Sequence, residues 1–88
     1  MARVDPDSLA DAERVFIAAS LTEALRVENL LTLSGVDYAV HVEIFSTSLF
    51  GSPRNGAAFY VAAGQAAYCR SHLRAAGLGR GVVEDPPA

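Results

Sequence analysis

A helix, a glycine stop and a strand follow one another in residues 20–44, and this succession constrains the fold more than any other stretch. Ser20 and Glu23 have the spacing of a capping box, in which the serine accepts from a first-turn amide and the glutamate reaches back to the serine amide. Gly35 favours the left-handed conformation that ends a helix. Between them runs a stripe with the three- and four-residue spacing of a helix face, made of Ala24, Val27, Leu30, Leu31 and Ser34.

After Gly35 the period of the sequence changes to two, which predicts a strand with one buried and one more open face. A slip by one residue would expose every valine, so we expect a single register. The face expected under the helices holds Val36, Tyr38, Val40, Val42 and Ile44, with Phe59 and Val61 from a later strand. The other face holds Asp37, Ala39, His41, Glu43 and Phe45.

Shorter patterns predict the remaining elements. Residues 1–13 are expected to be a flexible arm in which Asp5-Pro6 can start a helical turn, residues 14–84 a single domain, and residues 85–88 a tail. Within the domain we expect a first strand at 14–19, a loop at 46–56, a third strand at 57–63, a second helix at 64–76 stopped by Gly77, and a last strand at 79–84. The order is strand, helix, strand, twice over. It predicts an α+β, ferredoxin-like βαββαβ sandwich, with two helices on one face of a four-stranded antiparallel sheet.

Composition excludes several classes of function. The chain has 88 residues and a net charge of -3, which disfavours the phosphate contacts of a nucleic-acid binder. The open sheet face also lacks the aromatic and basic pairs of an RNA-binding sheet. The longest apolar run, residues 57–63, is too short to cross a membrane. A single cysteine, Cys69, cannot form an intrachain disulfide. We therefore expect a cytoplasmic protein with no nucleic-acid or membrane partner.

Two small groups of residues could carry chemistry. His41 and Glu43 share a strand face with Asp37 and could hold a metal or act as acid and base; the alternative is the polar face of a half-buried strand. Cys69 and His72 lie three residues apart and could form a nucleophile and base; the alternative is a small core cysteine. No catalytic triad, phosphate-binding loop or dinucleotide fingerprint is present, so we expect a protein without a cofactor that is not an enzyme.

The loop at residues 46–56 is rich in turn formers but also contains large apolar and basic side chains. Its backbone amides and arginine could bind a small anion, or its apolar residues a protein partner. The alternative is a plain hairpin connection. The candidate site residues are Leu49, Phe50, Gly51, Ser52, Arg54 and Asn55.

The chain resembles a small prokaryotic family of signal-transducing proteins of unknown function, whose fold is similar to that of the PII nitrogen regulators. The resemblance lies in three stretches: residues 15–20 with Ala24, residues 30–36, and residues 59–61 with the alanine-rich helix that follows. The family's acidic start of the second helix is replaced here by residues 64–67, Gly-Gln-Ala-Ala. The resemblance implies a regulatory module whose loop at 46–56 meets ligands and partners.

We therefore expect a signal-transducing binding module that acts through this loop and through its sheet face. The alternative is a small, cofactor-free, dimeric ferredoxin-like enzyme with a cavity between sheet and helices. A single layer of helices leaves the other sheet face open, so we also expect a homo-oligomer, a dimer or trimer. Its interface is expected at Ala39, His41, Ala58 and Tyr60.

Overall fold

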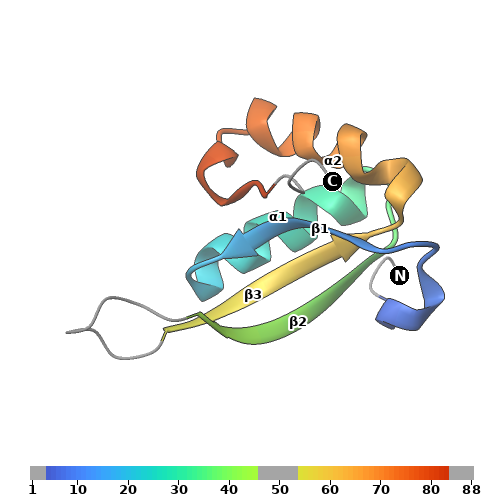
Figure 1. Ribbon diagram of the computed structural model, residues 1–88. Coiled ribbons are helices and arrows are strands. Elements are labelled where there is room, and N and C mark those ends of the chain that lie inside the picture. The colour runs from blue at the N-terminus through green and yellow to red at the C-terminus, as the bar shows by residue number, and fades with distance from the viewer. Residues whose placement is uncertain (1–3, 46–53, 84–88) are drawn as a thin grey trace.

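A computed structural model describes residues 4–45 and 54–83 of the chain. Both helices lie on the same face of an antiparallel sheet, and the hairpin of the second and third strands reaches beyond them (Figure 1). The elements in chain order are η1 (Pro6–Ser8), β1 (Glu13–Ala18), α1 (Leu21–Leu33), β2 (Tyr38–Phe45), β3 (Arg54–Val61), α2 (Ala63–Ala75) and η2 (Gly79–Gly81). The predicted helices, the short N-terminal turn and the first three strands are therefore confirmed, with shifted ends.

The start of α1 follows the predicted cap with one difference. The Ser20 hydroxyl accepts the backbone amide of Glu23 at 3.1 Å, as expected. The Glu23 carboxylate accepts the amide of Ala19, not that of Ser20, at 3.2 Å. The cap thus reaches one residue further back and ties the end of β1 to the first turn of α1.

Both helices end at the predicted glycines in the left-handed conformation, with φ of 72° at Gly35 and 83° at Gly77. At the end of α1, the amide of Val36 donates to the carbonyl of Leu31 at 3.1 Å. Both of these side chains are buried, which is the apolar contact that accompanies this kind of helix end. The stop therefore also sets the direction in which the chain enters β2.

The sheet has three strands in the order β1-β3-β2, so the predicted four-stranded ferredoxin-like sandwich is wrong for the part of the chain that the structure describes. Where a fourth strand was expected, η2 is followed by a single antiparallel bridge between Phe16 and Val82. Two glycines in this segment, Gly79 and Gly81, offer no side chain for a sheet to pack. Gly81 also lies against the ring of Phe16, where a Cβ atom would overlap the ring.

A side chain of α2 holds the chain after η2 against β1. The Arg70 guanidinium donates to the carbonyl of Val83 at 2.7 Å and to the carbonyl of Arg14 at 3.0 Å. It also pairs with the carboxylate of Glu13 at 3.4 Å. These bonds from one arginine hold together segments that a longer strand ladder would otherwise join.

The first strand contains a bulge that regular alternation does not predict. Arg14 pairs with Tyr60 and Phe16 with Phe59, so Val15 is an extra residue on β1. As a result two consecutive side chains, Val15 and Phe16, are both fully buried. The bulge thus gives the thin core one more large side chain than strict alternation would.

The core lies between the sheet and the two helices, as the periodicity predicts. Of the face expected to be covered, Tyr38 and Val36 are buried and Val40 is partly buried. Val42 is the exception, at 67% exposed. It lies beside the first turn of α1, where it and Leu21 line a hollow that the helix does not fill. The largest fully buried side chains are Phe16, Phe59, Leu31, Leu73, Val15, Val27, Val61 and Cys69.

Candidate functional site

The predicted loop site falls largely outside the described residues, since these exclude 46–53. Leu49, Phe50, Gly51 and Ser52 belong to that stretch. Arg54 and Asn55 were expected in the loop but lie in β3, which starts three residues earlier than predicted. They pair there with Phe45 and Ile44 of β2. The strand pairing extends further than the turn-forming composition suggests, and a role for the loop stays a prediction.

The predicted oligomer face is assembled by the strand register. Ala39 pairs with Tyr60, and His41 pairs with Ala58, on two adjacent rows of one sheet face. Both alanines are fully buried within the single chain, whereas His41 is exposed and Tyr60 is half-buried. The accessible part of the four-residue set is therefore His41 and Tyr60. An interface on this face stays a prediction.

The two chemical hypotheses receive different outcomes. The side chain of Glu43 lies outside the described part of the structure, so the group of His41, Glu43 and Asp37 stays a prediction. Among the side chains that the structure describes, no group of three or more histidine, cysteine or acidic residues could hold a metal ion. Cys69 is fully buried, and burial raises the pKa of its thiol from 9.0 to about 11, although the nearby charge of Arg70 acts in the opposite direction. A protonated thiol is a poor nucleophile. Cys69 is therefore a core residue, and His72 is exposed at the surface of α2.

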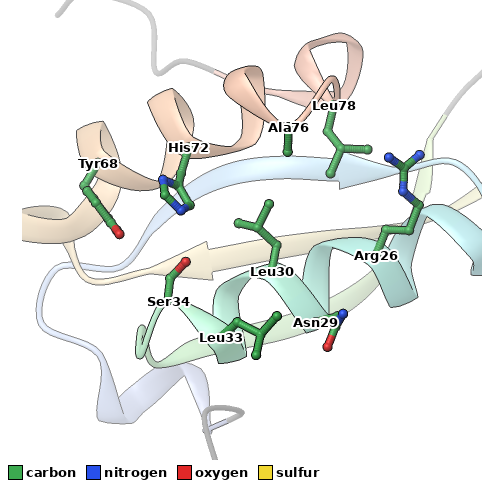
Figure 2. A pocket seen from close by; sticks show the side chains of 9 residues that line it. All are labelled: Arg26, Asn29, Leu30, Leu33, Ser34, Tyr68, His72, Ala76 and Leu78. Atoms are coloured by element: carbon green, nitrogen blue, oxygen red, sulfur yellow. The ribbon is translucent and has the colours of Figure 1, made fainter.

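A groove of about 630 Å³ lies between α1 and α2, on the outer side of the helix layer. Figure 2 shows side chains of both helices pointing into it. The helices bury other faces against the sheet: α1 buries Ala24, Val27 and Leu31, and α2 buries Ala66, Cys69 and Leu73. The groove is lined by Arg26, Asn29, Leu30, Leu33, Ser34, Tyr68, His72, Ala76 and Leu78.

The groove combines apolar surface with an aromatic pair. Leu33 is 80% exposed and Tyr68 is 48% exposed, although both are large side chains that proteins commonly bury. The ring of Tyr68 stacks on that of His72, with ring centroids 5.0 Å apart and planes inclined by 24°. Leu30 points from α1 toward α2 between these groups (Figure 2). Such a surface can bind the apolar side of a segment and can form hydrogen bonds with polar groups that border that side.

The charge of the groove differs from that of the chain. The protein as a whole has a net charge of -3, yet none of the nine lining residues is acidic. Arg26 supplies a positive charge on α1, and Asn29 lies one turn further along the same helix. An anionic group would thus meet a cation here without facing a carboxylate of the lining.

The predicted site residues do not include this groove. Its lining comes from two helices that lie far apart in the sequence, and it combines stripe residues such as Leu30 with positions such as Arg26 and Asn29, which periodicity assigns to solvent. One signal was present: Leu33 lies outside the stripe of the first helix, and Tyr68 and His72 have the four-residue spacing that brings side chains together on a helix. Only the placement of the two helices brings these residues together.

Comparisons with protein families, with curated proteins and with solved structures found no match to this chain. No helix within residues 4–45 and 54–83 is long and apolar enough to span a membrane. The geometry of the groove is therefore the main basis for a functional proposal.

Proposed function

We propose that this protein is a small regulatory binding module whose groove between α1 and α2 binds an amphipathic, acidic segment of a protein partner. The observation that carries the proposal is the exposure of Leu33 and Tyr68 in a groove that contains Arg26 and no acidic residue. Large exposed apolar side chains that gather in one place are typical of binding surfaces. The module class agrees with the expectation from the sequence, while the surface differs from the predicted loop.

The shape of the groove favours a protein segment over a small molecule. Small-ligand sites enclose most of their ligand, whereas this groove is open to solvent. An amphipathic helix can lay its apolar side into such a groove, with anchors spaced three and four residues apart. In this arrangement Leu30 and Leu33 would contact the apolar anchors, and Arg26 would pair with a carboxylate beside them.

The alternative function, a small enzyme, was expected to use a cavity between sheet and helices. In the part of the chain that the structure describes, that space holds the packed core, including Phe16, Phe59 and Leu73. The groove between α1 and α2 is thus better supported as a site than a cavity between the sheet and the helices. The loop at residues 46–56 remains a candidate second contact for the same partner or for a small anion.

A library of synthetic helical peptides with acidic residues beside an apolar stripe tests the proposal. We expect binders to shift the backbone amide signals of α1 and α2 around Leu33 and Tyr68 in NMR spectra. Leu33→Glu should abolish binding without lowering the melting temperature, because the side chain is mostly exposed. Shifts confined to the sheet or to residues 46–56 would contradict the proposed site.

A charge reversal at Arg26 distinguishes specific recognition of an acidic peptide in the groove from electrostatic attraction to the protein as a whole. Arg26→Glu should weaken acidic peptides at least tenfold and favour basic ones, because the groove would then hold a carboxylate. Arg80→Glu is the matched control, since it changes the same charge at an exposed position outside the groove. Equal losses in the two variants would mean that net charge, not the groove, governs binding.

A further inference from the structure

The free edge of β2 carries backbone groups that its own sheet does not use. β2 is an outer strand, because the order of the sheet is β1-β3-β2. On its outer edge the carbonyl of Tyr38 accepts the amide of Val4 at 2.7 Å. Backbone direction alternates along a strand, so the backbone groups of Val40, Val42 and Ile44 point the same way. Within the described residues, Val4 is the one backbone partner on this edge.

An apolar hollow lies on the helix side of the same edge. Val42, at 67% exposed, and Leu21, at 76% exposed, line a hollow of about 210 Å³ together with Ala57. Leu25 follows one turn later on α1 and is 56% exposed. The free edge and the hollow adjoin at Val42, which belongs to both. Natural proteins seldom leave such an edge uncovered, because it pairs readily with another strand.

We infer that a second copy of this chain covers this surface, with the two β2 strands paired antiparallel about a twofold axis. Val4 already occupies the carbonyl of Tyr38, so among residues 4–45 and 54–83 the outward groups without a backbone partner belong to Val40, Val42 and Ile44. The symmetric register that uses all three places Val42 opposite Val42 of the partner subunit. This pairing is self-complementary, as a twofold interface requires.

The same register is favourable for the neighbouring positions. It places Val40 opposite Ile44 of the partner subunit and His41 opposite Glu43 of the partner subunit, so no like charges oppose each other. It also brings the apolar hollows of the two copies together on the helix side of the joined sheet. A second copy is therefore a better match than a charged partner, which would leave Leu21 and Val42 without apolar contacts.

The inference does not depend on the proposed groove function. The groove lies on the side of α1 that faces α2, and the hollow lies over β2 and β3, on the other side of α1. A dimer formed through β2 would leave Leu33 and Tyr68 accessible. Loss of peptide binding and loss of dimerisation can thus be measured separately in the same protein.

Cross-linking tests the register. In Val42→Cys the two engineered thiols would lie close to the twofold axis, on residues whose Cα atoms are about 5.5 Å apart in a hydrogen-bonded antiparallel pair. A short bifunctional thiol reagent should convert most of this variant to a species of twice the 9.3 kDa chain mass. The matched control is Leu33→Cys, because Leu33, at 80% exposed, is even more accessible than Val42 but lies away from the edge. The native Cys69 is buried and should react much more slowly than either engineered thiol.

Light scattering of the unmodified chain and of two variants completes the test. We expect a dimer for the wild type, a monomer with an unchanged circular dichroism spectrum for Val42→Lys, and a dimer for Tyr60→Glu. A monomeric wild type at high micromolar concentration would overturn the inference. So would a dimer that Tyr60→Glu dissociates and Val42→Lys leaves intact, because that result places the interface on the open sheet face. Equal cross-linking of the Val42→Cys and Leu33→Cys variants would also overturn it.

Discussion

Replacing Leu31 by alanine tests whether the core has been assigned correctly. Leu31 is 1% exposed and lies in the main apolar cluster, where it also makes the contact with Val36 that accompanies the end of α1. The substitution removes three buried carbon groups, which lowers the free energy of unfolding by about 2.4 kcal/mol at 0.8 kcal/mol each. An incompletely collapsed cavity adds about 1 kcal/mol. We therefore expect a loss of roughly 3–4 kcal/mol.

This loss is large for a chain of 88 residues, whose total stability is expected to be roughly 4–13 kcal/mol. Equilibrium unfolding in urea, followed by circular dichroism, measures it. Leu33→Ala is the matched control, because it makes the same substitution in the same helix at a position that is 80% exposed. We expect it to change stability by less than about 0.5 kcal/mol. Similar losses in the two variants would refute the assignment of the buried face of α1.

Three further predictions concern the core and the C-terminal segment. Gly81→Ala should destabilise the fold by about 1–3 kcal/mol in urea unfolding, because the added Cβ atom would overlap the ring of Phe16; an unchanged midpoint would show that the segment moves freely away from the ring. Cys69 should react slowly with a thiol reagent in the native protein. The free energy of unfolding should decline as pH rises from 9 toward 11, because burial raises the pKa of the folded thiol to about 11 while the unfolded thiol ionises near 9.0. A Cys69→Ala variant with the same alkaline decline would contradict this cause. Arg70→Met should increase amide hydrogen exchange at Val83 and lower the melting temperature, because the guanidinium donates to the carbonyl of Val83; unchanged exchange would mean that the bridge beside β1 holds the segment alone.

The local structure was predictable because short-range rules decide it. The cap at Ser20 and the glycine stop at Gly35 depend on residues within one turn, and both are confirmed. The burial of Leu31 and of Tyr38 follows from the spacing of apolar residues along single elements. Each of these features can be read from a window shorter than one helix or strand.

The sequence thus determined two helices, three strands and most of the residues that face the core. Only the tertiary structure decided the rest: the bulge at Val15, the replacement of a fourth strand by the contacts of Arg70, the exposure of Val42, and the groove that Leu33 and Tyr68 share. The physical reason is the same in every case. A backbone group needs a partner, and an apolar side chain needs a cover, but that partner or cover comes from a distant part of the chain. Periodicity shows which side of an element seeks contact, and packing decides what that side meets.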